Sequence, residues 1–270
     1  MEIKTTIIDD LSINYAQSVK NSAETLLLLS PLPENLLAFV PIWEGLVSKY
    51  NIVAVDLPNF GKSQSRSSLL SPKAMSAFIF KIMDHFNIDA AHIVGPDIGT
   101  TVGFFAAEAH PERVRSVIGG SAACVFPIQS AGILTDMIMD PTLDGLKKYA
   151  SADIISGALD NISVFQLPKE RKQDYIDSYA DGRFWDTMLF LKALPKELPS
   201  MDYTKLDIPV LILWGKNDPL AIVENGIILN QQLPKSKLYI LETGHYVWED
   251  EHENYLNHLI KWIDGEYLDV

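Results

Sequence analysis

The feature that most restricts the fold of this chain is a regular alternation of short apolar runs with longer helical patterns. Parallel strands need long crossover connections, which are usually helices, so this rhythm predicts an α/β fold with a mostly parallel central sheet flanked by helices. The expected strands are Thr25–Leu29, Ile52–Val55, His92–Val94, Val114–Ile118, Val210–Leu213 and Leu238–Leu241. The expected helices are Leu36–Lys49, Lys73–Phe86, Thr100–His110 and Tyr255–Ile263.

Two other segments complete the predicted organisation. Ile3–Ile8 and Ser12–Ala16 alternate apolar with polar residues, which predicts an antiparallel hairpin at the edge of the sheet. From Phe126 to about Lys205 the strand rhythm stops, and prolines and glycines separate several helical stretches. We therefore expect one core built from residues 1–125 and 206–270, with residues 126–205 inserted as a helical segment.

Composition limits the class of protein. With 270 residues, 47% of them hydrophobic, the chain can bury one large core. The formal net charge of -13 and the lack of a basic patch argue against a nucleic-acid partner. The start lacks a basic, apolar leader and the longest early apolar run is Leu26–Leu29, so we expect a cytoplasmic protein without membrane association. The single cysteine, Cys124, excludes an internal disulfide and a multi-cysteine zinc site. We expect no metal or cofactor, a small-molecule substrate, and a monomer or homodimer.

The strongest local motif is Gly95-Pro96-Asp97-Ile98-Gly99, which follows the expected strand at 92–94 and precedes an expected helix. It has the form of a nucleophile elbow, Gly-x-Ser-x-Gly, with aspartate in place of serine. Glycines on both sides allow the strand and helix to approach closely around a strained residue. Such a pattern also occurs where aspartate only caps a helix, so its interpretation depends on partner residues elsewhere.

Two partners follow in the chain order nucleophile, acid, histidine. Asp218 follows the expected strand at 210–213, and His245 follows the expected strand at 238–241. Because the carboxyl ends of parallel strands meet at one edge of a sheet, we expect both side chains beside Asp97. An aspartate can attack an sp3 carbon directly and form an ester. His245 can then activate the water that hydrolyses this ester, while Asp218 orients the imidazole. We therefore predict a triad of Asp97, Asp218 and His245.

These residues resemble the α/β-hydrolase superfamily, and within it the aspartate-nucleophile branch of epoxide hydrolases and haloalkane dehalogenases. The segment from Asp56 to Ser63 is similar to the family loop D-x-P-G-x-G-x-S, with Asn59 replacing a glycine. Gly95 to Gly99 is similar to the G-H-D-I-G of epoxide hydrolases, with Pro96 replacing the histidine. The resemblance implies an α/β-hydrolase fold in which residues 126–205 form the helical cap over the site.

The resemblance also implies an oxyanion hole made of the backbone N–H groups of Leu32 and Ile98. The family usually has H-G-x-P after its third strand, whereas this chain has Ser30-Pro31-Leu32-Pro33. Neither Leu32 nor Ile98 is a proline, so both donors survive this change. We expect the change to affect the shape of the loop and its access to solvent.

The expected leaving group follows from the neighbours of Asp97. Haloalkane dehalogenases hold halide with a tryptophan after the nucleophile and often an asparagine in the oxyanion loop, and the aliphatic Ile98 and Leu32 cannot donate such bonds. Epoxide hydrolases polarise the opening oxygen with two cap tyrosines, or with a tyrosine and a histidine. The cap of this chain offers four aromatic candidates for substrate contact, which are Tyr149, Tyr175, Tyr179 and Trp185. The family's second cap tyrosine has no counterpart in the run 188–192.

We therefore expect a hydrolase that acts on a neutral apolar small molecule through an alkyl-enzyme ester on Asp97, with epoxide hydrolysis to a diol as the leading reaction. Three alternatives stay open at this stage. They are a dehalogenase with unusual halide ligands, a cofactor-free ring cleavage or cyclisation that depends on His245, and a ligand-sensing protein on a hydrolase scaffold.

Overall fold

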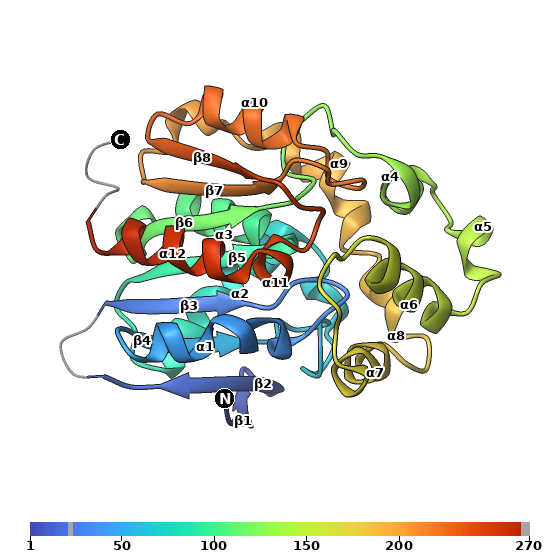
Figure 1. Ribbon diagram of the computed structural model, residues 1–270, viewed down its shortest axis with the longest axis horizontal. Helices are drawn as coiled ribbons and strands as arrows, with labels where there is room; N and C mark the ends of the chain where they lie inside the picture. Colours follow the sequence, from blue (N-terminus) through green and yellow to red (C-terminus); the bar gives the residue numbers. More distant parts are fainter. Residues whose placement is uncertain (21–23, 266–270) are drawn as a thin grey trace.

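The computed structural model describes residues 1–20 and 24–265 of the chain. At its centre lies an eight-stranded sheet with the strand order β1-β2-β4-β3-β5-β6-β7-β8 (Figure 1). β1 pairs antiparallel with β2, and β2 with β4, whereas the other neighbouring strands are parallel. The mostly parallel sheet and its N-terminal edge hairpin, both predicted from the sequence, are confirmed. The strands are β1 (Ile3–Ile8), β2 (Leu11–Ser18), β3 (Thr25–Leu29), β4 (Asn51–Val55), β5 (Ala91–Pro96), β6 (Val114–Gly120), β7 (Val210–Gly215) and β8 (Ser236–Leu241).

Helices cover both faces of this sheet, which explains why its central strands are apolar on both sides. In β3, the four leucines from Leu26 to Leu29 are fully buried. α1 (Val40–Val47) and α12 (His252–Ile263) pack together on one face, and α2 (Pro72–His85) and α3 (Ile98–Ala109) pack together on the other (Figure 1). α10 (Glu224–Gln232) packs against β7 and β8.

The four expected helices of the core are present, with ends shifted by a few residues. The first is divided, because a 3-10 turn, η1 (Leu36–Phe39), precedes α1. α2 begins where local chemistry favours a helix start: the Ser71 hydroxyl accepts a hydrogen bond from the backbone N–H of Ala74 at 3.2 Å, and Pro72 occupies the first turn. α10 and the short α11 (Val247–Asp250) were not predicted. Among the described residues, no helix is both long and apolar enough to cross a membrane.

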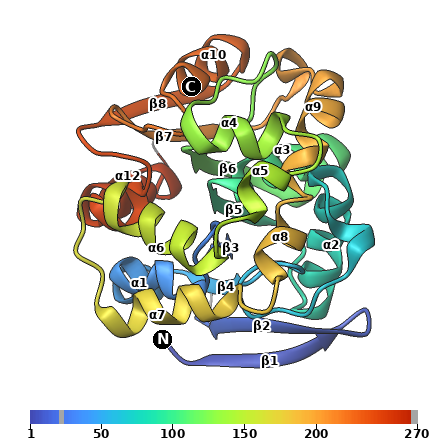
Figure 2. The ribbon, with the colours of Figure 1, turned by 90° about the vertical axis from the view of Figure 1, so that its right-hand side faces the viewer.

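The segment between β6 and β7 contains helices and loops but no strand, and every residue from 121 to 209 is described. Figure 2 faces this segment and shows α4, α5, α6 and α8 in front of the sheet. We call residues 126–205 the cap. Its α-helices are α4 (Gly132–Met139), α5 (Asp144–Lys147), α6 (Ser151–Asn161), α7 (Lys169–Ser178), α8 (Arg183–Thr187) and α9 (Leu194–Glu197). Its 3-10 turns are η4 (Leu191–Ala193), η5 (Leu198–Ser200) and η6 (Tyr203–Lys205), and η2 (Ser67–Leu69) and η3 (Pro111–Arg113) lie in the core.

Candidate active site

Asp97 lies on the tight turn between the end of β5 and the start of α3. Its backbone has φ 51° and ψ −125°, a strained conformation for a residue with a side chain. A Cβ atom on Gly95 would lie only 2.6 Å from the backbone carbonyl carbon of Gly99. β5 and α3 can therefore approach this closely only because Gly95 has no side chain. The structure thus contains the sharp elbow that the Gly-x-Asp-x-Gly pattern predicts.

The elbow is tied to the neighbouring strand β6 by hydrogen bonds. The backbone N–H of Asp97 donates to the carbonyl oxygen of Gly120 at 2.9 Å. The Thr100 hydroxyl donates to the carbonyl oxygen of Gly95 at 2.8 Å and accepts from the backbone N–H of Gly120 at 2.8 Å. These bonds satisfy buried backbone groups around a strained residue and fix the direction of its side chain. No motif in the sequence predicts this role of Thr100.

The Asp97 carboxylate accepts a hydrogen bond at Oδ2 from the backbone N–H of Leu32, at 2.9 Å. Burial raises the pKa of Asp97 to about 6, although the charge of His245 and the backbone N–H groups of Leu32 and Ile98 act in the opposite direction. The two predicted oxyanion donors therefore both face the carboxylate. Replacing H-G-x-P with Ser30-Pro31-Leu32-Pro33 leaves the Leu32 donor in place.

His245 and Asp218 stand beside Asp97, as their positions after β8 and β7 predict. The Nδ1 atom of His245 lies 2.8 Å from Oδ2 of Asp218. The other Asp218 oxygen accepts from the backbone N–H groups of Leu220 and Ala221, at 2.9 and 3.0 Å. Because an ionised carboxylate only accepts, Nδ1 carries the proton and Nε2 is the basic atom.

The Nε2 edge of the His245 imidazole points toward Asp97. Nε2 of His245 lies 3.8 Å from Oδ1 of Asp97, which is too long for a direct hydrogen bond. Burial disfavours the charged imidazole, but the Asp218 carboxylate and its hydrogen bond, together with Asp97, outweigh this and raise the pKa of His245. Asp97 and His245 both line one cavity, so a water molecule or a substrate atom in it can contact both side chains.

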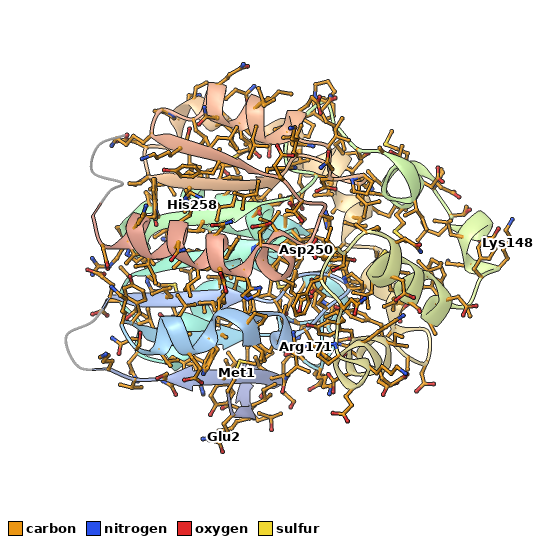
Figure 3. The ribbon with its side chains drawn as sticks, viewed as in Figure 1. Met1, Glu2, Lys148, Arg171, Asp250 and His258 are labelled. Atoms are coloured by element: carbon orange, nitrogen blue, oxygen red, sulfur yellow. The ribbon has the colours of Figure 1, made fainter. Side chains whose placement is uncertain are left out.

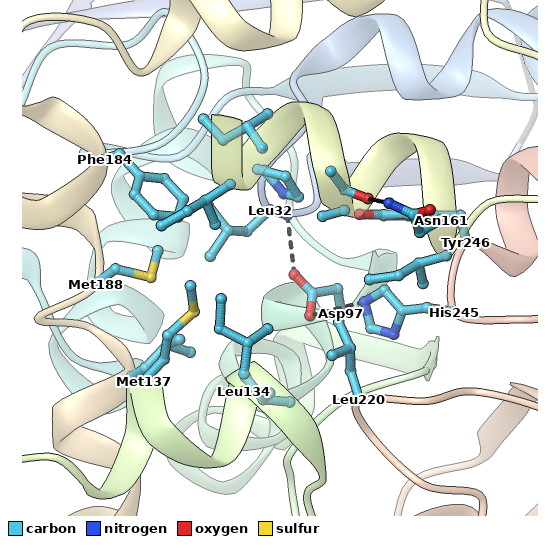
Figure 4. A pocket seen from close by; sticks show the side chains of 18 of the residues that line it. Leu32, Asp97, Leu134, Met137, Asn161, Phe184, Met188, Leu220, His245 and Tyr246 are labelled. Atoms are coloured by element: carbon cyan, nitrogen blue, oxygen red, sulfur yellow. Dashed lines mark hydrogen bonds and ion pairs between the residues drawn. The ribbon is translucent and has the colours of Figure 1, made fainter. Parts of the chain in front are cut away.

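A cavity of about 330 Å³ opens above Asp97 and His245, between the core and the cap (Figure 4). Its polar lining consists of Asp97, Asp153, Asn161, His245 and Tyr246, and no lysine or arginine of the described chain lines it. The lining is otherwise apolar apart from the backbone of Gly157. The apolar lining residues are Leu32, Pro33, Ile133, Leu134, Met137, Ile154, Ile155, Ala158, Ile162, Phe184, Met188, Leu191 and Leu220.

Comparison with known proteins agrees with this architecture. Residues 24–151 match the family described as alpha/beta hydrolase fold. The chain is 24% identical over 266 residues to "Uncharacterized hydrolase YugF" of Bacillus subtilis, covering 97% of each chain. It is 26% identical over 215 residues to "2-hydroxy-6-oxononadienedioate/2-hydroxy-6-oxononatrienedioate hydrolase" of Paraburkholderia phymatum, covering 74% of this chain and 72% of the relative.

Solved structures share the whole fold at low sequence identity. Haloalkane dehalogenase DbeA from Bradyrhizobium elkani superposes with a TM-score of 0.83 at 16% identity, and 98% of each chain is covered. Epoxide hydrolase VrEH1 from Vigna radiata superposes with a TM-score of 0.80 at 15% identity, and 97% of each chain is covered. This protein has the α/β-hydrolase fold.

The cap of this α/β-hydrolase fold does not bring its predicted tyrosines to the cavity. Tyr149 is exposed, and Trp185 is half-buried against the ring of Phe184. The Tyr175 hydroxyl donates to Oε1 of Glu249 at 3.0 Å, and the Tyr179 hydroxyl donates to the Glu34 carbonyl oxygen at 3.0 Å. None of Tyr149, Tyr175, Tyr179 and Trp185 lines the cavity. The expected substrate contacts are therefore not found, because the two buried hydroxyls satisfy their hydrogen bonds on the core instead.

The cap of the hydrolase fold is fixed to α11, directly after His245 in the chain. Oδ1 of Asp250 accepts from the Ser163 hydroxyl at 2.7 Å and from the backbone N–H groups of Val164 and Phe165 at 2.9 and 2.7 Å. Oδ2 of Asp250 accepts from the Thr243 hydroxyl at 3.0 Å. Figure 3 labels Asp250 at this junction of α11 with the cap. One carboxylate thus connects the loop between α6 and α7 with the turn that carries the histidine.

Two buried glutamates lie beside the site and were not predicted. Glu34 follows the oxyanion loop, and its Oε2 accepts from the indole N–H of Trp248 at 3.1 Å. Glu249 on α11 accepts at Oε1 from Arg171 of α7 at 3.2 Å. Both side chains are fully buried. Burial and the adjacent Glu249 raise the pKa of Glu34 well above its ordinary value. Burial also raises the pKa of Glu249, but contacts with Glu34, Arg171 and Tyr175 oppose this rise, so we place the shared proton of the pair on Glu34. These two glutamates differ from the other glutamates that the structure describes in being fully buried, and no pattern in the sequence predicts that burial.

Proposed function

We propose that this protein hydrolyses neutral, largely apolar epoxides to diols through a covalent ester with Asp97. The observation that carries the proposal is a carboxylate at the elbow that faces an apolar cavity of about 330 Å³ together with His245. The similarity to hydrolases supports the general class of reaction. A carboxylate in this position can attack carbon without first losing a proton to a base, which a serine could not do.

In the first step, Oδ1 of Asp97 attacks a ring carbon of the epoxide. The Oδ2 atom stays against the backbone N–H of Leu32, which orients the carboxylate. A C–O bond of the ring breaks as the ester bond forms, and the ring oxygen leaves as an alkoxide that must receive a proton. The apolar walls favour a neutral substrate and exclude competing water from the attacked carbon.

In the second step, water attacks the carbonyl carbon of the ester. His245 accepts the water proton at Nε2, and Asp218 stabilises the resulting imidazolium. The developing negative charge falls on the ester oxygen that faces the N–H groups of Leu32 and Ile98. Collapse of this intermediate releases the diol and restores the Asp97 carboxylate.

The lining argues against an anionic substrate. The name of the Paraburkholderia phymatum relative denotes a dicarboxylate substrate, whose recognition calls for cationic groups. The described cavity contains the acids Asp97 and Asp153 and no lysine or arginine. We therefore propose a different substrate class for this chain than for that relative.

Halide release is the alternative that the similarity to DbeA raises. It needs hydrogen-bond donors beside the nucleophile. The Trp248 indole N–H donates instead to Glu34, and Trp185 does not line the cavity. These contacts support epoxide opening over halide release.

The test is trapping of the ester. His245→Gln removes the base of the second step only, so we expect this variant, mixed with styrene oxide, to accumulate one covalent adduct on the peptide that contains Asp97. Intact-protein and peptide mass spectrometry measure it. Asp97→Asn lacks the nucleophile, so we expect no adduct and a loss of turnover of about a thousandfold or more.

Controls separate the alternatives. Wild-type protein should release a diol from styrene oxide but no bromide from 1-bromohexane. Full turnover by Asp97→Asn would contradict the proposal and favour chemistry that depends on His245 alone. Binding of both probes without any conversion by wild-type protein would favour a ligand-sensing role.

A further inference from the structure

Epoxide opening creates a requirement that the cap tyrosines of this chain do not meet. The leaving oxygen develops negative charge and must receive a hydrogen bond and then a proton. The hydroxyls of Tyr175 and Tyr179 donate to Glu249 and to the Glu34 carbonyl oxygen, and neither residue lines the cavity. A donor must therefore come from elsewhere in the lining.

The side chains that line the cavity offer few donors. The Nδ1 proton of His245 is directed to Asp218, and its Nε2 has to stay unprotonated to act as the base. The Asn161 amide donates to the carbonyl oxygen of Gly157 at 2.7 Å within its own helix, and Asn161 is an exposed residue. The remaining side-chain donor in the described lining is the hydroxyl of Tyr246.

Tyr246 is buried and its ring is packed against two aromatic residues, but its hydroxyl has no hydrogen-bond partner among the described residues. The residue is 1% exposed. Its ring packs edge-on against His245, with 5.1 Å between ring centroids, and against Trp248, with 5.7 Å. No described residue forms a hydrogen bond with the Tyr246 hydroxyl. A buried hydroxyl usually has a partner, so an unpartnered one in the wall of a cavity points to a ligand atom.

Electrostatics keep this hydroxyl protonated. Burial raises the pKa of Tyr246 well above its ordinary value, and the nearby carboxylates of Glu34 and Asp97 raise it further. The phenol is therefore a hydrogen-bond donor at neutral pH. The ring oxygen becomes strongly basic as its C–O bond breaks, so it can take the phenolic proton.

We infer that the Tyr246 hydroxyl binds the epoxide oxygen and donates the proton that completes ring opening, in place of a cap tyrosine. This inference rests on the proposed function. As the ester bond to Asp97 forms, the electron pair of the broken C–O bond goes to the ring oxygen, which takes the phenolic proton. In the second step His245 takes one proton from water and passes it to the Tyr246 phenolate, and the other water proton goes to the alkoxide that leaves as the ester C–O bond breaks. The sum is epoxide plus water giving a diol.

The experiment measures the rate of ester formation in the His245→Gln background, where the adduct accumulates. Tyr246→Phe removes only the hydroxyl, so we expect the adduct from styrene oxide to form about a hundredfold more slowly. Ester formation from an alkyl sulfonate should be unchanged, since a sulfonate leaves without a proton. Because the hydroxyl has no partner to lose, Tyr246→Phe should also keep wild-type thermal stability.

Tyr255→Phe is the matched control. The Tyr255 hydroxyl is likewise buried and without a hydrogen-bond partner, but Tyr255 lies on α12 and does not line the cavity. This variant should form the adduct at the rate of its parent. Equal adduct rates for Tyr246→Phe and its parent would overturn the role of Tyr246 while leaving the ester mechanism intact. Absence of an adduct from both probes in the parent would instead overturn the proposed function.

Discussion

At the scale of single residues, Asp97 occupies an environment that is costly for a carboxylate and suited to a nucleophile. Its side chain is 15% exposed and its backbone is strained at φ 51°. Leu32, Ile98 and His245 compensate only part of the burial, so the pKa is raised to about 6. A poorly solvated carboxylate is a stronger nucleophile than one in water, because less solvent must be removed at the moment of attack.

The pH dependence of ester formation follows from this pKa. The attacking form is the carboxylate, so kcat/KM for styrene oxide should rise as pH increases through about 6. Between about pH 7 and about pH 5 the rate should fall about tenfold. Stopped-flow measurement of adduct formation in the His245→Gln background should show the same rise with its midpoint at higher pH, because the His245 charge that lowers the Asp97 pKa is gone. A profile that is flat from about pH 5 to about pH 8 would contradict an ionisable nucleophile at Asp97.

The raised pKa of Asp97 affects the stability of the fold in the direction opposite to its effect on the reaction rate. A carboxyl group whose pKa is raised in the folded protein stabilises the fold below its unfolded value of 3.8, and this contribution is lost as pH rises through about 6. Asp97 is therefore in the carboxylate form that the proposed attack requires in the pH range where it contributes least to folding.

The residues that form the site could be predicted only where a local sequence motif marks them. The elbow glycines, Asp97 after a strand, and the chain order of Asp218 and His245 are local signals, and the geometry brings these side chains together. Tyr246 has no such signal, because an aromatic residue after a histidine is equally consistent with packing. Its importance depends on an unused hydroxyl, which only three-dimensional contacts reveal.

At the scale of elements, the core was more predictable than the cap. Strands of the parallel sheet are buried on both faces and bounded by turns, so their apolar runs mark them clearly. The cap helices are short, and their packing decides which side chains reach the cavity. Tyr175 and Tyr179 lie on or next to α7, yet their hydroxyls point to Glu249 and Glu34 of the core. Sequence alone does not report which face of a short helix docks.

Glu34, next to the oxyanion loop, lies against Trp248 and Glu249 of α11, and Arg171 of α7 contacts Glu249. Other polar or charged groups around the pair of glutamates are Tyr175, Tyr246 and Asp97. Since Glu34 has its pKa raised, the stability it contributes is present below its unfolded value and is lost as pH rises through its folded value. Wild-type stability should therefore fall as pH rises through the raised pKa of Glu34.

Paired variants test this arrangement. Glu34→Gln can still accept from the Trp248 indole and donate to Glu249, so it mimics the protonated acid and should match or exceed wild-type stability at about pH 8.5. Glu249→Gln removes the carboxylate that Arg171 and Tyr175 contact, and should cost about 3 kcal/mol. Urea unfolding at about pH 6 and about pH 8.5 measures both. Equal destabilisation by the two variants would contradict a shared proton.

At the scale of the whole molecule, the site exists only because distant parts of the chain meet. Asp97 follows β5, Asp218 and His245 follow β7 and β8, and the cap between β6 and β7 closes the cavity over them (Figures 1 and 4). The fold class was predictable because strand and helix patterns alternate along the whole core sequence. The substrate was not, since the cavity's shape depends on how the cap docks through Asp250 and Arg171.

The origin of the oxygen added to the substrate tests the central claim most directly. With wild-type protein in excess over styrene oxide, a single turnover in heavy-oxygen water should place the heavy oxygen in the Asp97 carboxylate, because water attacks the ester carbonyl, and the first diol should carry ordinary oxygen from Asp97. Mass spectrometry of the diol and of the Asp97 peptide measures both. Heavy oxygen in the first diol with none in Asp97 would mean that water attacks the epoxide directly, and would contradict the account.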